Sequence, residues 1–284
     1  FDNRKAAKEL GGMKKIFVAL LILMFVSING YSQTTCQIED SILWYLNKVD
    51  QYSLYSGEYW EGKDDTLIYY NDGLRTYLLN TLEHHPQTLS VAFERASKIM
   101  HITTSGDRKF RIYSWNEKSG GTMEGFYSVL QYKAASGTKA QAIYPKPGDI
   151  RDMTDNGEAP GFWYAKIYTL KPHRNKTFYI ALRRSQLLNY LGTCGVRAFT
   201  IKGDKLNDSI KLFNNYAPSN SIDYAYDLFS NYNDKRRKEK WVVHFSRNKH
   251  KLYVPIVVDE KVSGKYLVYK FDGKCYVLKR KPDN

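Results

Sequence analysis

The sequence has few cysteines and lacks the compact motifs that mark common enzymes. Cys36, Cys194 and Cys275 form no C-x-x-C pair, so neither a redox dithiol nor a zinc ribbon is indicated. There is no H-E-x-x-H for a zinc protease, no G-x-S-x-G for a serine hydrolase and no glycine-rich phosphate loop. These absences remove the enzyme classes that a sequence identifies most directly.

Long apolar runs are also missing, apart from one near the beginning of the chain. Met13 is followed by two lysines, an uncharged apolar run over residues 16–26, and small or polar residues up to Gln33. This order is typical of a secretory signal peptide. A run of about 11 residues is too short for a bilayer core, which needs roughly 20. We therefore expect a signal peptide over residues 13–33 and a product without a transmembrane anchor.

The residues beside this segment support the same expectation. Residues 1–12 carry no targeting pattern, and we expect them to be an upstream extension outside the fold. Cys36 follows Thr35 rather than a small residue, and Gln33 stands where a lipoprotein usually has leucine, so lipid attachment is not expected. The predicted location is the periplasm or the extracellular space. In such an oxidising compartment, Cys194 and Cys275 are the expected disulfide pair.

The charge is strongly positive, with 43 basic and 29 acidic residues and a net charge of +14. Such a balance favours anionic partners, although solubility alone also explains it. The basic residues are spread along the chain, with one cluster at residues 235–240. We expect an anionic or glycan component of the cell envelope as the partner, and not nucleic acid. No feature favours a particular oligomeric state.

Helical periodicity is confined to residues 34–100. Three apolar stripes recur there at steps of three and four residues: Ile38, Ile42, Leu46 and Val49; Leu74, Leu78 and Leu82; and Leu89, Phe93, Ala96 and Met100. The second helix should end at His84 or His85, because the proline at position 86 disfavours helix for the residue before it.

From about residue 101 the apolar period changes to two, which is typical of strands. Strand signals fall at residues 110–115, 123–133, 162–170, 177–182, 197–202, 209–213, 241–245, 252–258, 266–270 and 275–278. The predicted fold class is α+β. A helical segment over residues 34–100 precedes a predominantly antiparallel β body over residues 101–284, with sandwich-like or propeller-like repeats.

A weak internal repeat motivates the propeller-like alternative. Residues 105–113 followed by 128–133, and residues 246–254 followed by 266–270, both read as polar turn, strand, loop and a strand ending in Tyr-Lys. Chance similarity of two hairpins explains the pattern equally well.

Two short stretches carry a resemblance to known proteins. Residues 109–115 with 120–123, and the ending at residues 269–274, resemble a group of secreted Gram-negative bacterial proteins of unassigned function. The resemblance extends loosely over residues 75–278. It implies a predominantly β body behind a signal peptide, and it implies no activity and no site residue.

Two segments have the residue types of a metal site. His84 and His85 are adjacent, but neighbouring helix residues point about 100° apart and cannot easily share an ion. Residues 152–157 match the start of a calcium loop, yet the twelfth position, which should be glutamate, is Trp163. We therefore expect neither a metal ion nor a cofactor.

The clearest candidate for binding follows the proline- and glycine-containing loop at residues 145–160. Trp163 and Tyr164 could form a platform that stacks on sugar rings, and Lys166 could contact an anionic group. The alternative is that these aromatic residues begin a buried strand.

Two classes of function are compatible with these features. The absence of catalytic motifs favours a non-catalytic binding or envelope-associated protein. The alternative is a secreted hydrolase acting on polysaccharide or peptide. A hydrolase requires two carboxylates, or a carboxylate and a histidine, that face each other across a cleft.

Overall fold

The computed structural model describes residues 33–55, 57–119, 124–144, 161–173, 176–229 and 243–279. The chain divides into two compact units, residues 1–38 and residues 39–284. The described part of the shorter unit ends in the first turn of helix α2.

The described elements are helical first and β-rich afterwards, as the change of period near residue 101 predicts. The helices are α2 (Thr35–Gln51), α3 (Lys63–His84) and the 3-10 turns η1 (Pro86–Leu89) and η2 (Ala96–Lys98). The strands are β1 (His101–Thr104), β2 (Phe110–Asn116), β3 (Phe126–Lys133), β4 (Thr138–Tyr144), β5 (Trp163–His173), β6 (Lys176–Gln186), β7 (Leu191–Lys202), β8 (Lys205–Asn207), β9 (Phe213–Asn214), β10 (Pro218–Ser219), β11 (Ser221–Asp227), β12 (His244–Phe245), β13 (Lys251–Val258), β14 (Lys261–Phe271) and β15 (Tyr276–Leu278). Within these described segments, no helix combines the length and apolar character needed to cross a membrane.

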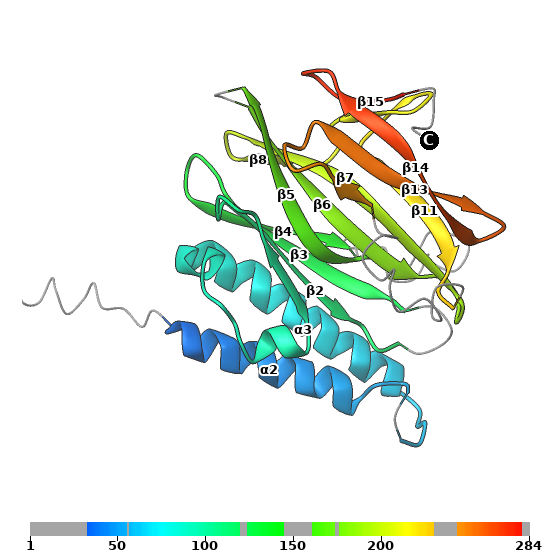
Figure 1. Cartoon of the computed structure of the whole chain (residues 1–284). Coiled ribbons are helices and arrows are strands. Elements are labelled where there is room, and N and C mark those ends of the chain that lie inside the picture. Colours follow the sequence, from blue (N-terminus) through cyan, green and yellow to red (C-terminus); the bar gives the residue numbers. More distant parts are fainter. Residues whose placement is uncertain are drawn as a thin grey trace, which may run out of the picture. The chain divides into compact units, whose positions relative to one another are not determined.

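The strands form three sheets (Figure 1). The helix-side sheet has the order β1-β2-β3-β4, and the middle sheet has the order β11-β7-β6-β5, with β8 pairing β7. The outer sheet has the order β10-β9-β15-β14-β13-β12. Apart from the parallel pair β15–β9, the described pairings are antiparallel. The predicted α+β class with a mostly antiparallel β body is confirmed.

The middle sheet is buried on both faces, which makes the body sandwich-like. On one face of β6, Phe178, Ile180 and Leu182 belong to a core shared with the outer sheet. On the other face, Tyr179 and Ala181 belong to a core shared with the helix-side sheet. A strand covered on both faces has no polar side, and the centre of β6, residues 178–182, is accordingly a continuous apolar run.

The other face of the helix-side sheet is covered by α3, which contacts β3 and β4 (Figure 1). Trp115 on β2 donates its indole N–H to Asn71 Oδ1 on α3 at 2.9 Å. From β3, the amide of Gln131 donates to the carbonyl oxygen of Leu82 at 2.9 Å and to Thr88 Oγ1 at 2.7 Å. These buried polar side chains fix the position of the helix on the sheet, because an unpaired buried polar group is costly.

The third predicted helix, over residues 89–100, does not form, and this is the main correction to the predicted helices. Glu39 accepts hydrogen bonds from the backbone N–H groups of Arg95 and Ala96, at 2.8 and 3.0 Å, so these donors need no helical partner. Only the short turns η1 and η2 form in this segment. The apolar residues of the stripe are nevertheless buried: Leu89, Phe93, Ala96 and Met100.

The predicted disulfide is wrong, because no disulfide joins Cys36, Cys194 or Cys275 in this structure. Cys194 lies buried on β7, and burial raises the pKa of its thiol. Cys275 lies in the turn before β15, beside Asp272. Cys194 therefore belongs to the core of the sheets, whereas Cys275 lies in a turn.

Candidate functional site

Two turns with the same hydrogen-bond pattern precede β2 and β13. In the first turn, Ser105 Oγ donates to Asp107 Oδ1 at 2.7 Å. In the second turn, Ser246 Oγ donates to Asn248 Oδ1 at 2.8 Å. Each serine oxygen also accepts the backbone N–H of the residue five positions later, at 3.0 Å in both turns. The repeat seen in the sequence therefore corresponds to a repeated local structure.

The equivalence extends to the backbone around each turn. Arg108 and Lys249 occupy the same position and both adopt the left-handed conformation, with φ of 55° and 60°. Past the turn, the carbonyl of Lys109 accepts a hydrogen bond from the end of β3, and the carbonyl of His250 accepts one from the end of β14. The turns differ chemically at two central positions: Gly106 stands where the second turn has Arg247, and Asp107 carries a carboxylate where Asn248 carries a neutral amide.

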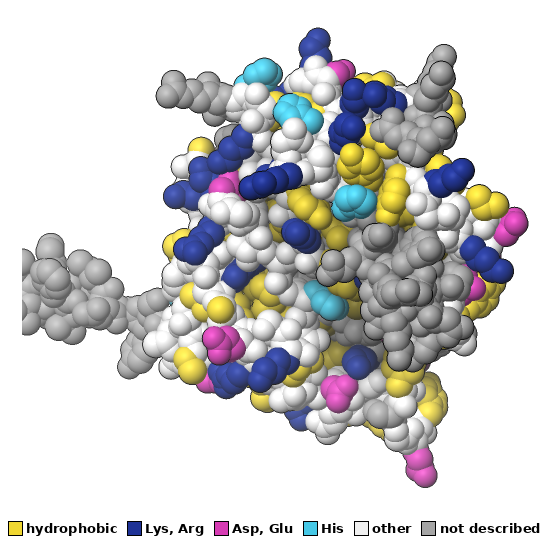
Figure 2. All heavy atoms as spheres, viewed as in Figure 1, with side chains coloured by type: hydrophobic (Ala, Val, Ile, Leu, Met, Phe, Trp, Pro, Cys, Tyr) yellow, Lys and Arg dark blue, Asp and Glu magenta, His cyan; other side chains and the backbone are white. Residues whose placement is uncertain are grey.

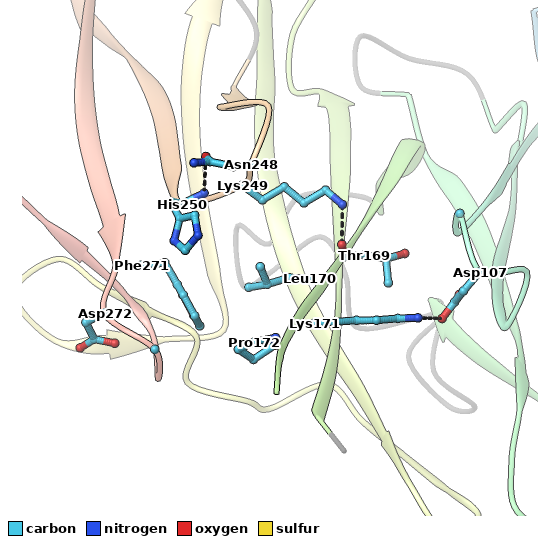
Figure 3. A pocket seen from close by; sticks show the side chains of 12 residues that line it. Asp107, Thr169, Leu170, Lys171, Pro172, Asn248, Lys249, His250, Phe271 and Asp272 are labelled. Carbon is cyan, nitrogen blue, oxygen red and sulfur yellow. Dashed lines mark hydrogen bonds and ion pairs between the residues drawn. The ribbon is translucent and has the colours of Figure 1, made fainter. Parts of the chain in front are cut away.

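Together with β5, the two turns line a groove (Figure 3). The larger cavity, about 780 Å³, is lined by residues 106–107, 169–172, 248–250 and 271–273. A smaller cavity of about 370 Å³ is lined by Gly106 and residues 166–169, 245–247 and 249. Both cavities include Gly106, Thr169 and Lys249, so we treat them as one groove.

The groove is basic. Its cationic side chains are Lys166, Lys171, Arg247 and Lys249. Among the residues that the structure describes, only Lys171 of these four lies within ion-pair distance of a carboxylate, 4.0 Å from Asp107. The groove therefore presents more positive than negative charge.

Two of these cations are held in place by neighbouring groups. Lys249 Nζ donates to the carbonyl oxygen of Thr169 at 2.7 Å and so reaches across to β5 (Figure 3). Lys166 Nζ lies 5.0 Å from the ring centroid of Tyr168, a cation–π distance. Tyr168 packs against Phe245 with ring centroids 4.7 Å apart, so the basic groove has an aromatic wall.

Both carboxylates of the groove are engaged by hydrogen bonds. Asp107 Oδ2 accepts the hydroxyl of Tyr179 at 3.1 Å, in addition to the bond from Ser105 to Oδ1. In the turn before β15, Asp272 Oδ1 accepts two backbone N–H groups at 2.8 and 2.7 Å, and these bonds lower its pKa. His250 is the histidine that lines the larger cavity, and in the described part of the chain neither carboxylate is hydrogen-bonded to it.

The structure separates the three residues that the sequence proposed for binding. Lys166 is exposed in the groove. Tyr164 is buried in the core between the middle and helix-side sheets. Trp163 is half-buried and stacks on His101, with ring centroids 4.1 Å apart, and the Arg184 guanidinium lies 5.5 Å from its ring. The loop at residues 145–160 lies outside the described residues.

An irregularity in β5 explains this separation. Strict alternation would place Tyr164 and Lys166 on the same face of the strand. The pairing with β6 shifts register between these two residues, so Tyr164 and Ile167 both face the core. Such a bulge adds one residue to the strand and changes which side chains point outward.

The segments considered for metal binding have other surroundings. His84 ends α3, and its Nδ1 lies 2.7 Å from the carbonyl oxygen of Asn80. Residues 152–157 fall outside the described residues. Within the described ranges, no three histidine, cysteine, aspartate or glutamate side chains are grouped to hold a metal ion.

The groove residues Asp107, Arg247, Asn248 and Lys249 were not among the predicted site residues. Their signal in the sequence was the similarity between residues 105–113 and 246–254, which marks two equivalent turns but not their convergence on one groove. No protein-family model, curated protein or solved structure matches this chain. The resemblance to secreted Gram-negative proteins therefore stays a prediction.

Proposed function

We propose that this protein is a secreted, non-catalytic component of the cell envelope that binds an acidic glycan in the groove. The observation that carries this proposal is the set of four groove cations, of which one has a carboxylate partner within the described chain. Ammonium and guanidinium groups pair with carboxylate or phosphate substituents of a sugar chain. Lys and Arg side chains are also frequent over the face shown in Figure 2, which favours the approach of a polyanion.

The aromatic wall supports a glycan rather than a simple anion. Tyr168, Phe245 and Phe271 line the groove and are half-buried. Aromatic rings offer apolar faces on which the C–H face of a sugar ring can pack. The two cavities share lining residues, so the groove suits several sugar units of an extended chain better than one small ion.

The state of the carboxylates supports binding over hydrolysis. A glycoside hydrolase needs one carboxyl group that donates a proton and a second that acts as base or nucleophile. Asp107 and Asp272 instead accept hydrogen bonds that stabilise their turns. A carboxylate whose pKa is lowered, as that of Asp272 is, makes a weak base.

The two equivalent turns supply a matched test. Asn248→Asp should preserve the second turn, because aspartate fills the same position in the first, but it adds a negative charge to the groove. Asp107→Asn makes the reverse change. With polygalacturonate as the probe, isothermal titration calorimetry should show affinity reduced about two- to fivefold by Asn248→Asp and not reduced by Asp107→Asn.

Controls separate this groove from general electrostatic attraction. Lys166→Gln should weaken binding, whereas Lys98→Gln, which removes the same charge at an exposed position outside the groove, should not. Equal losses from the two lysine variants, or equal affinity for single-stranded DNA, would refute an acidic-glycan groove. Shortening of the polymer during incubation, detected as new reducing ends, would favour the hydrolase alternative.

A further inference from the structure

A second surface, on α2, α3 and the segment between them, is rich in exposed aromatic residues. Trp44, Tyr59, Trp60 and Tyr69 have exposed fractions of 51%, 70%, 46% and 70%. We call these four residues the aromatic surface. None of them lines the groove, so an inference from them is independent of the proposed glycan binding.

The aromatic surface rests on an ordered ring cluster. Tyr70 stacks on Tyr52 with an interplanar angle of 9° and ring centroids 5.3 Å apart. Trp44 and Tyr69 meet Tyr70 edge to face, at 5.8 and 5.3 Å, and Trp60 meets Tyr52 at 6.3 Å. Three of the four exposed rings, those of Trp44, Trp60 and Tyr69, are therefore supported by half-buried neighbours, which reduces the conformational entropy that they would lose on binding.

Acidic residues lie next to these aromatic residues in the sequence. Glu58, Glu61, Asp64 and Asp65 are exposed, and in the described residues none of them has an ion-pair partner. Asp65 and Tyr69 are four residues apart on α3 and share one face of the helix. Acidic residues in the first turn of a helix are ordinary, because they stabilise its N-terminus. That explanation does not apply to Glu58 and Glu61, which precede the helix.

We propose that the aromatic surface docks a basic, arginine-rich segment of a partner protein. Four exposed carboxylates outnumber the nearby cations Lys48 and the buried Lys63, so the local charge is negative on a chain with a net charge of +14 and is complementary to a cationic partner. Arginine stacks on tryptophan and tyrosine rings and pairs with carboxylates through two parallel hydrogen bonds. Tryptophan and tyrosine are also the residues that most often dominate protein–protein binding energy.

A neutral glycan is the competing occupant, because sugar rings also stack on aromatic side chains. Neutral sugars gain less from four unpaired carboxylates than a guanidinium does. The charge around the rings therefore favours the arginine-rich segment, and the test includes the glycan as an opposing outcome.

The probe is a fluorescent nona-arginine peptide, compared with nona-lysine by fluorescence anisotropy on the purified protein. We expect saturable binding that weakens with salt and is tighter for nona-arginine. Trp60→Ala and Tyr69→Ala should each weaken it about tenfold, a typical effect of losing one cation–π contact. Tyr216→Ala is the matched control, because Tyr216 is 95% exposed and takes part in none of these ring contacts.

A second pair of variants tests the charge and leaves the rings in place. Glu61→Gln and Asp65→Asn should weaken nona-arginine binding severalfold without changing the thermal unfolding midpoint. The proposal is overturned if the peptide does not bind, or if its binding is insensitive to the Trp60, Tyr69 and carboxylate variants. It is equally overturned if chitohexaose or cellohexaose, rather than the peptide, binds in a manner that Trp60→Ala abolishes.

Discussion

Replacing Asn71 on α3 by alanine should weaken the docking of the helix on the helix-side sheet. The Asn71 side chain is buried, with 2% of its surface exposed. Its Oδ1 accepts the indole N–H of Trp115 at 2.9 Å, and its Nδ2 donates to the carbonyl oxygens of Leu67 and Glu117 at 3.1 and 2.9 Å. One amide thus joins α3 to β2 and to the residue that follows it.

The expected loss of stability follows from these three bonds. A hydrogen bond contributes about 0.5–1.5 kcal/mol net, and a buried donor left without a partner costs about 1–3 kcal/mol. Trp115 is 1% exposed, so water cannot replace the lost acceptor easily. We expect Asn71→Ala to lower the free energy of unfolding by about 3 kcal/mol. Asn80→Ala, the same change at an exposed position of α3, should alter it by less than about 0.5 kcal/mol.

Urea denaturation of a double-mutant cycle measures the central bond. In the Trp115→Phe background the indole donor is absent, so Asn71→Ala should cost about 1 kcal/mol less than in the parent protein. A loss below about 1 kcal/mol for Asn71→Ala, or strict additivity with Trp115→Phe, would refute a role of the Asn71–Trp115 hydrogen bond in docking α3.

Two further predictions concern side chains outside the groove. Trp163→Ala removes the stack on His101, so it should lower the free energy of unfolding by about 1–2 kcal/mol and leave the affinity for polygalacturonate unchanged. A loss of affinity at unchanged stability would instead indicate that Trp163 belongs to the binding site. Burial raises the pKa of Glu117 in the folded protein. The contribution of this carboxyl group to stability is therefore fully present below its ordinary pKa, and it is lost as the pH rises through the raised pKa. Glu117→Gln should therefore stabilise the protein more at neutral pH than near pH 4, and denaturation curves with the same difference at both pH values would contradict this reasoning.

Local elements were largely predictable from the sequence. The end of α3 at His84 follows from the proline two positions later, and the start of β1 at His101 follows from the change of apolar period. These features depend on neighbouring residues and backbone sterics alone. The edge strand β11 was not predicted, because its pairing depends on β7, a partner distant in sequence.

The candidate site was predictable only in part. Lys166 was identified as a cation near a loop, and the structure places it in the groove. Tyr164 was proposed with it, but the register shift in β5 turns its ring into the core. A bulge arises from pairing with the adjacent strand, so strict alternation along one strand cannot reveal it.

The sequence by itself determined the order of helices and strands, and the two equivalent turns at Ser105 and Ser246. These depend on side chains that bond to backbone groups a few residues away. Only the tertiary structure decided that both turns border one groove, because they lie more than a hundred residues apart and meet through the packing of three sheets. The basic character of the groove has the same origin, since its cations come from β5 and from the turn before β13, and sheet packing alone brings them together.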